Sequence, residues 1–252
     1  MAIGISISGE PGTISAAIVR DSLSDLLVIL ADASANSGSG DQQWRIADLR
    51  IGSAVMSVTA PDEAPVAALV RDGLESLSRM AEIPAIPAGW TRRMVGKVRD
   101  LGSRSGHDGA TGVNFIGLAA EPIGLTSAVV DHATRSLGTA TLSYGSFRGH
   151  VDRWNEHNKR EIGIALDDGG TITATYPPDL AERIRAEAVG RHIEVWGLVS
   201  RNPAGQANSI AAQGFDALTQ APPIPIANMA GAYVVDGTPM LDLAAWMADR
   251  GA

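Results

Sequence analysis

The chain has 252 residues, of which 28 are acidic and 20 basic, and 45% are hydrophobic. This composition is typical of a globular protein and excludes wholesale disorder, and the length suggests one or two domains. The absence of cysteine excludes disulfides, thiolate zinc sites and cysteine nucleophiles. The sequence shows no signal peptide and no apolar run of membrane-helix length, so we expect a cytoplasmic protein without membrane association.

The first 138 residues predict an α+β domain, in which alternating apolar positions indicate strands and apolar positions at helical spacing indicate helices. The expected elements, in chain order, are a strand at residues 3–9, a helix carrying Val19 to Leu30, two strands within 42–60, a helix from Glu63, a helix over 90–101, a strand near 113–116 and a helix over 125–137. The pattern does not specify how these strands are ordered in a sheet.

The pattern changes at Thr139 to five strand-like runs and one helix. They are strands over 141–154, 161–166 and 171–176, a helix over 179–188, and strands over 192–200 and 209–218. This order is that of the OB-fold, a small five-stranded barrel. Gly149 in the first strand fits the bend that such a barrel needs. We therefore predict an OB-like barrel domain over residues 139–219.

Glycines and a tryptophan in this region carry a resemblance to a known class of domain. Gly145 and Gly149, the turn after Leu166, and Val195-Trp196-Gly197 resemble OB-type nucleic-acid-binding domains at the end of uncharacterised two-domain bacterial proteins. The resemblance covers about residues 143–218. It implies a barrel that binds nucleic acid or docks a protein, because OB-folds serve both purposes.

The candidate nucleic-acid contacts lie in the first and third strands of the predicted barrel and in the loop between the first two. OB-folds bind single strands with cations that contact phosphate and with aromatic rings on which bases stack. The candidates are Arg148, Arg153, Lys159 and Arg160 for phosphate, and Trp154 and Tyr176 for stacking. Residues 140–218 hold eight basic and ten acidic side chains, however, so a solvated edge of mixed charge is the alternative interpretation.

Residues 220–252 predict a proline-containing linker followed by an amphipathic helical tail. Aromatic and methionine side chains are typical anchors of protein interfaces, and an amphipathic helix commonly binds in a groove of a partner. The candidate partner contacts are Tyr233, Met240, Leu243, Trp246 and Met247. The layout resembles the toxin-binding tails of bacterial antitoxins. The alternative is a terminal helix that packs on the protein's own domains.

No catalytic motif and no histidine spacing suited to a metal is present, so we expect neither enzymatic activity nor a cofactor or metal. The leading hypothesis is a non-catalytic binding protein whose tail docks a protein partner, such as a basic ribonuclease toxin neutralised by an acidic antitoxin. The second hypothesis is a regulator that binds single-stranded nucleic acid through the OB-like domain. A homodimer is compatible with either, because small barrels have open edges.

Overall fold

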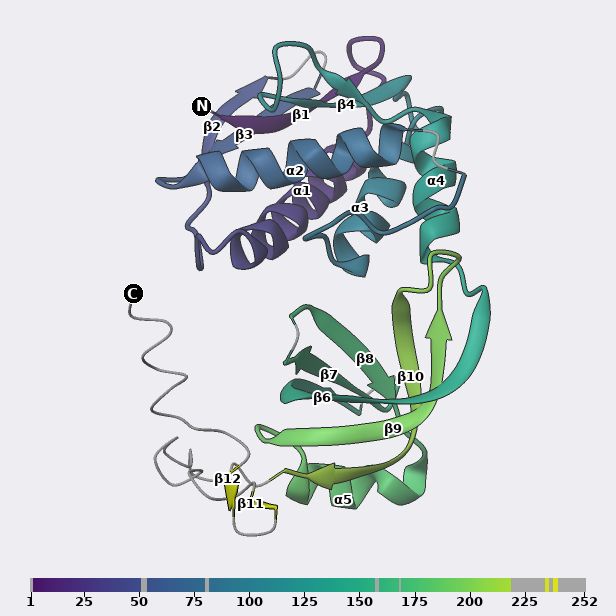
Figure 1. Cartoon of the computed structure of the whole chain (residues 1–252). Coiled ribbons are helices and arrows are strands. Elements are labelled where there is room, and N and C mark those ends of the chain that lie inside the picture. The colour runs from purple at the N-terminus through teal and green to yellow at the C-terminus, as the bar shows by residue number, and fades with distance from the viewer. Residues whose placement is uncertain are drawn as a thin grey trace. The chain divides into compact units, whose positions relative to one another are not determined.

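The computed structural model describes residues 2–50, 54–79, 82–156, 159–167 and 169–218, together with the backbone of β11 (Val234–Val235) and β12 (Thr238–Pro239). The chain divides into two compact units, Met1–Ala217 and Leu218–Ala252. Figure 1 shows helices and sheets together in the first unit, which confirms the predicted mixed α+β class. No helix in the described part is long and apolar enough to cross a membrane.

The predicted tail helix and its partner contacts lie outside the described residues. This applies to the side chains of Tyr233, Met240, Leu243, Trp246 and Met247. Docking through the tail therefore stays a prediction.

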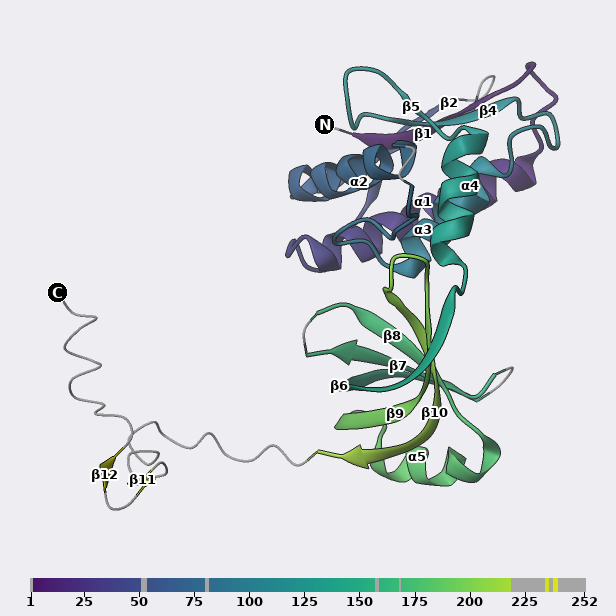
Figure 2. The ribbon, with the colours of Figure 1, turned by 45° about the vertical axis from the view of Figure 1, so that its right-hand side comes forward.

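The N-terminal half of the first unit is an antiparallel sheet with helices on one face (Figures 1 and 2). The strands follow the order β2-β3-β1-β4-β5, and every pair in it is antiparallel. They are β1 (Ile3–Ser8), β2 (Arg45–Arg50), β3 (Ala54–Thr59), β4 (Gly112–Ile116) and β5 (Ile123–Gly124). The helices are α1 (Ala16–Asn36), α2 (Glu63–Ser78), α3 (Arg92–Gly102) and α4 (Ser127–Leu137).

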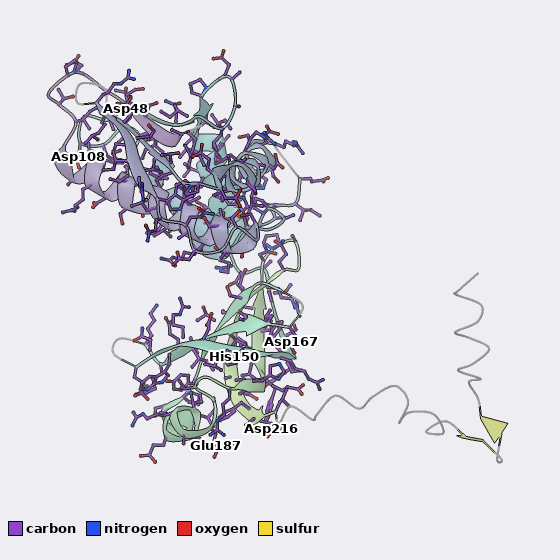
Figure 3. The ribbon with its side chains drawn as sticks, turned by 90° about the vertical axis from the view of Figure 1, so that its left-hand side faces the viewer. Asp48, Asp108, His150, Asp167, Glu187 and Asp216 are labelled. Atoms are coloured by element: carbon purple, nitrogen blue, oxygen red, sulfur yellow. The ribbon has the colours of Figure 1, made fainter. Side chains whose placement is uncertain are left out.

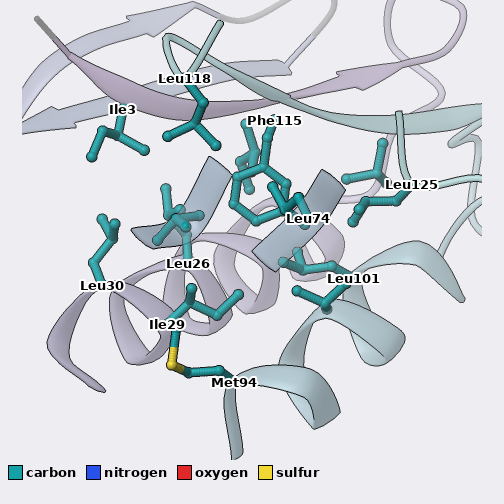
Figure 4. Close-up of a cluster of buried hydrophobic side chains, with 14 of the residues drawn as sticks. Ile3, Leu26, Ile29, Leu30, Leu74, Met94, Leu101, Phe115, Leu118 and Leu125 are labelled. Atoms are coloured by element: carbon teal, nitrogen blue, oxygen red, sulfur yellow. The ribbon is translucent and has the colours of Figure 1, made fainter. Parts of the chain in front are cut away.

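Hydroxyl side chains fix where three of these helices begin. Ser15, Thr91 and Thr126 each accept a hydrogen bond from a backbone N–H in the first turn of α1, α3 and α4, which satisfies a donor that has no partner within the helix. The helices then bury aliphatic faces against alternate sheet residues such as Ile3 and Phe115 (Figure 4). The predicted helices therefore exist because their apolar faces have a sheet to cover.

A buried carboxylate links α1 to α3 inside this half. Asp25 on α1 is 4% exposed and forms ion pairs with Lys97 Nζ at 2.7 Å and with Arg104. Arg104 also donates to the hydroxyl of the buried Ser22 at 3.4 Å. The two cations compensate a charge that would otherwise be costly to bury.

The second half is a closed barrel of five strands in the order β10-β8-β7-β6-β9. The strands are β6 (Thr141–Asn155), β7 (Glu161–Leu166), β8 (Thr171–Thr175), β9 (His192–Arg201) and β10 (Ala207–Ala217). A 3-10 turn (Pro178–Leu180) and α5 (Ala181–Glu187) connect β8 to β9, and α5 lies at one end of the barrel in both views (Figures 1 and 2). These bounds agree with the predicted ones to within about two residues.

Inward-pointing aliphatic residues fill the barrel and form a core separate from that of the first half. Two glycines allow its strands to approach. A Cβ on Gly149 would lie 2.1 Å from the carbonyl oxygen of Ala165, and one on Gly197 would lie 2.0 Å from that of Ala211. Both positions require glycine because a backbone atom, not a flexible side chain, occupies the space.

Side-chain amides of the barrel hydrogen-bond to the backbone of the first half. Asn202 donates to the Ser136 carbonyl at 3.0 Å, and Gln206 both accepts from the Ile86 N–H and donates to the Ile86 carbonyl at 2.8 and 2.9 Å. Asn208 donates to the Gly138 carbonyl at 3.0 Å. These bonds connect the two cores within one compact unit.

Candidate nucleic-acid interface

Four outward positions form a row across neighbouring strands of the barrel. Arg153 of β6 stands opposite Gly163 of β7, Gly163 stands opposite Thr173 of β8, and Thr173 stands opposite Ser209 of β10. Side chains alternate between the two faces of a strand, and the residues on either side of Gly163 are buried in the barrel. The row, called here the Arg153 row, therefore lies on the outer surface.

A β-bulge places Arg153 in this row. The register shifts between Val151 and Arg153, so that one extra residue, Asp152, is inserted into β6. Without the shift, Asp152 would stand opposite Gly163, and Arg153 would point toward the barrel interior. The bulge thus turns a guanidinium group outward at a position that strict alternation would bury.

Gly163 leaves room for the Arg153 side chain to cross β7. A Cβ at this glycine would lie 2.9 Å from Asp152 Oδ1, 3.1 Å from Arg153 Cβ and 3.2 Å from Arg153 Nε, so the side chains of both bulge residues approach it. Arg153 Nη2 reaches the hydroxyl of Thr173, one strand further on, at 3.4 Å. Arg153 forms no ion pair with any residue that the structure describes, so its charge is available to an anion from solution.

A cavity of about 420 Å³ adjoins the Arg153 row. Its walls combine barrel residues with the end of α1 and the start of α3. The lining residues are Asp32, Ala35, Asn36, Thr91, Arg92, Arg93, Asp152, Arg153, Thr171, Thr173, Asn208 and Ser209. Three guanidinium groups and two carboxylates give the lining an excess of one positive charge.

The cations of the cavity differ in how they are compensated. Asp32 accepts from the Thr91 hydroxyl at 2.7 Å and pairs with Arg93 Nη1 at 3.4 Å, so this carboxylate is already engaged. Arg92 donates to the Leu137 carbonyl at 2.9 Å, and burial lowers the pKa of its guanidinium. Arg92 has no carboxylate partner among the described residues.

One of the two aromatic residues predicted to stack on bases, Tyr176, is not accessible to a base. Tyr176 is only 5% exposed, and its hydroxyl accepts a hydrogen bond from Trp154 Nε1 at 3.0 Å. Burial raises the pKa of the Tyr176 hydroxyl. Its ring belongs to the barrel core, so it offers no surface to a base. The burial of Tyr176 could not be predicted from the strand pattern, because a tyrosine at the end of a strand can point to either side.

The ring of Trp154, the other predicted stacking residue, is partly accessible from solvent. It is 38% exposed, but the guanidinium of Arg185 lies 5.4 Å from the ring centroid, and Arg185 is held by Glu156 at 2.6 Å. A cation–π contact of this kind stabilises the indole at the end of the barrel. Trp154 thus acts in the fold through both its N–H and its ring.

The four predicted cations divide into two groups. Arg148 pairs with Glu194 on β9 at 2.9 Å, so its charge is largely neutralised. Lys159 and Arg160 are exposed and form no ion pair within the described ranges. With Arg153, they give three cations that form no ion pair among the described residues, one on β6 and two in the connection from β6 to β7.

Two exposed aromatic residues of the barrel are not among the predicted stacking residues. Tyr144 on β6 is 74% exposed and Trp196 on β9 is 39% exposed. The outward position of Trp196 could have been predicted from the alternation of side chains along the strand, because its neighbour Val195 is apolar and buried. Within the described residues, no group of three or more histidine, aspartate or glutamate side chains is arranged to hold a metal ion.

These observations define a protein with an antiparallel α+β half and a closed five-stranded barrel, on which Arg153 forms no ion pair with a described residue. No protein-family profile matches the chain, and no curated protein matches it. Among solved structures, the chain is similar to the mitochondrial single-stranded DNA-binding protein Rim1 of S. cerevisiae, with 15% identity and a TM-score of 0.26, over 32% of this chain and 99% of that one. The proposal below rests on the geometry of the barrel.

Proposed function

We propose that the protein binds single-stranded nucleic acid on the outer surface of an OB-type barrel, with the Arg153 row contacting phosphates. The strand order with a helix between the third and fourth strands supports the OB assignment. The observation that carries the function is the Arg153 side chain itself. It lies across Gly163, reaches Thr173 and has no carboxylate partner among the described residues.

The chemistry of the row suits a phosphate backbone. A guanidinium group donates two parallel hydrogen bonds to phosphate oxygens, and threonine and serine hydroxyls add neutral donors. Thr173 and Ser209 supply such hydroxyls on the next two strands. Lys159 and Arg160 extend the positive charge along the connection from β6 to β7.

The acidic balance of the chain sets the expected strength. A net charge of −8 repels a polyanion at long range, so we expect binding that is modest and falls steeply with added salt. The proposal therefore predicts a measurable salt dependence that comes from a few local cations.

The test compares Arg153→Gln with a matched control. Fluorescence anisotropy would measure binding of a labelled oligothymidylate of about 16 nucleotides, the upper end of site sizes for an OB-fold, at several salt concentrations. Losing one phosphate contact reduces the slope of log affinity against log salt by about 0.7 and lowers affinity roughly tenfold at low salt.

The control is Arg71→Gln, which removes one positive charge from α2, where Arg71 pairs with Asp72 at 2.9 Å. It should leave both affinity and slope unchanged. Equal losses in the two variants would show that only net charge matters, and the proposed contact would be refuted. Absence of any binding by the unaltered protein at low salt would refute the function.

A further inference from the structure

The indole of Trp196 lies over Gly214 on the outside of the barrel. Trp196 stands opposite this glycine of β10, and a Cβ at Gly214 would lie 2.5 Å from Trp196 Cζ2 and 2.8 Å from Cε2. The glycine therefore leaves room for the ring to approach β10, and the residue remains 39% exposed.

Tyr144 is held beside it. The tyrosine stands opposite Leu198 on β9, and its hydroxyl accepts a hydrogen bond from Gln213 Nε2 at 3.3 Å. This bond reaches past β9 to β10, so the ring lies across the sheet surface while 74% of the residue is exposed. Both rings are thus positioned by partners within the barrel before any ligand arrives.

The surroundings of the two rings differ at the two ends. On the side of the Arg153 row, the next outward row holds Leu142, which is 62% exposed, and the hydroxyls of Ser200 and Ser209, with no charged side chain among the three. On the other side lie the pair Arg148 and Glu194 and the exposed Asp216, which is labelled in Figure 3. A polyanion on the rings would therefore run on the Ser209 side, which joins the Arg153 row through Thr173.

We propose that Tyr144 and Trp196 form a stacking platform for two unpaired bases of the strand that the Arg153 row holds by its phosphates. This inference rests on the proposed function and adds a second site to it. The platform gives binding to any sequence, since every base has a ring face to stack.

The register positions of Tyr144 and Trp196 suit a single strand. The two residues are diagonal neighbours on antiparallel strands, because Tyr144 pairs with Leu198 and Ser146 pairs with Trp196. Diagonal positions are separated by about 7 Å, roughly twice the 3.4 Å rise per nucleotide in one strand of B-DNA. A stretched strand with unstacked bases can place one base on each ring, whereas a duplex cannot.

The test uses Tyr144→Ala and Trp196→Ala with two probes of equal charge. One probe is a labelled oligothymidylate of about 16 nucleotides, and the other is an abasic oligodeoxynucleotide of the same length. Each alanine variant should bind the oligothymidylate about 5- to 100-fold more weakly, as loss of a stacked base does. The slope of affinity against salt should not change, and neither variant should differ from the unaltered protein on the abasic probe.

Three further variants separate the loss of a stacking ring from a loss of folding or of exposed apolar surface. Tyr144→Phe and Trp196→Phe retain a ring and should retain most of the affinity, even if an alanine variant folds poorly. Ile46→Ala removes an aliphatic side chain that is 64% exposed on β2 and should have no effect.

The outcomes separate the two proposals. If the unaltered protein binds both probes equally and the alanine variants match it, the platform is refuted and the phosphate contacts stand. If the unaltered protein binds neither probe, the proposed function fails and the platform fails with it. If alanine weakens binding equally on both probes and turns a dimer into a monomer by light scattering, the rings form an interface between two copies, which also refutes the platform.

Discussion

Replacing Asp25 by asparagine should destabilise the protein strongly. The carboxylate is 4% exposed and contacts two cations, Lys97 and Arg104, whose side chains are 32% and 19% exposed. Asn keeps the size and removes the charge, so it leaves two partly buried cations without their counter-ion. Removing one partner of a buried pair costs about 3–5 kcal/mol, and the partial exposure of the cations favours the lower end, about 3 kcal/mol.

Urea and thermal denaturation would measure this change. For a chain of this size, about 3 kcal/mol corresponds to a fall in Tm of roughly 6–12 °C. The matched control is Asp21→Asn on the same helix, because the Asp21 side chain is 46% exposed and, among the described residues, its ion pair is with its exposed neighbour Arg20. A fall in Tm no larger for Asp25→Asn than for Asp21→Asn would contradict the view that this ion cluster links α1 to α3.

Three other consequences of the fold can be measured. Burial, and to a smaller extent the charge of Arg135, lowers the pKa of His132, so the folded state favours the neutral ring. Stability should therefore fall as pH drops below about 6.5, because the unfolded chain then binds a proton that the folded state does not. In urea titrations, a His132→Gln variant should lose less stability between about pH 7.5 and pH 5 than the unaltered protein. Gly197→Ala should lower the free energy of unfolding by more than about 2 kcal/mol, because the added Cβ would collide with the Ala211 carbonyl. Gly96→Ala should raise the free energy of unfolding by about 0.5–1 kcal/mol, because the added Cβ meets nothing within 4 Å and alanine favours the interior of α3. Deleting residues 219–252 should leave the rest of the chain folded with its Tm nearly unchanged, because Met1–Ala217 forms a compact unit of its own. If circular dichroism shows that the shortened protein is unfolded, the tail is structural.

Periodicity predicted much of the barrel. Its strands alternate inward aliphatic and outward polar residues, and Pro177-Pro178 and Gly190 mark where the connecting helix lies. The two residues of β5 are too few to show any period, so that strand was not predicted. The strand order of the N-terminal sheet depends on contacts between segments about 50 or more residues apart in the chain, which local patterns do not encode.

The candidate site was predicted only in part, for reasons that individual residues make clear. Arg153 was predicted as a phosphate contact because it is a cation near an aromatic residue. Its outward position depends on a β-bulge that no sequence pattern predicts. Arg148 could not be known to be neutralised, because Glu194 lies 46 residues away on another strand. Tyr176 and Trp196 show the same difficulty for aromatic residues, since tertiary packing decides which ring is buried.

We propose that the barrel binds single-stranded nucleic acid through Arg153. The most direct test is the salt dependence of oligothymidylate binding by the unaltered protein and by Arg153→Gln and Arg71→Gln, measured by fluorescence anisotropy. We expect roughly tenfold weaker binding and a slope reduced by about 0.7 for Arg153→Gln alone. No binding by the unaltered protein, or identical behaviour of the two variants, would contradict it.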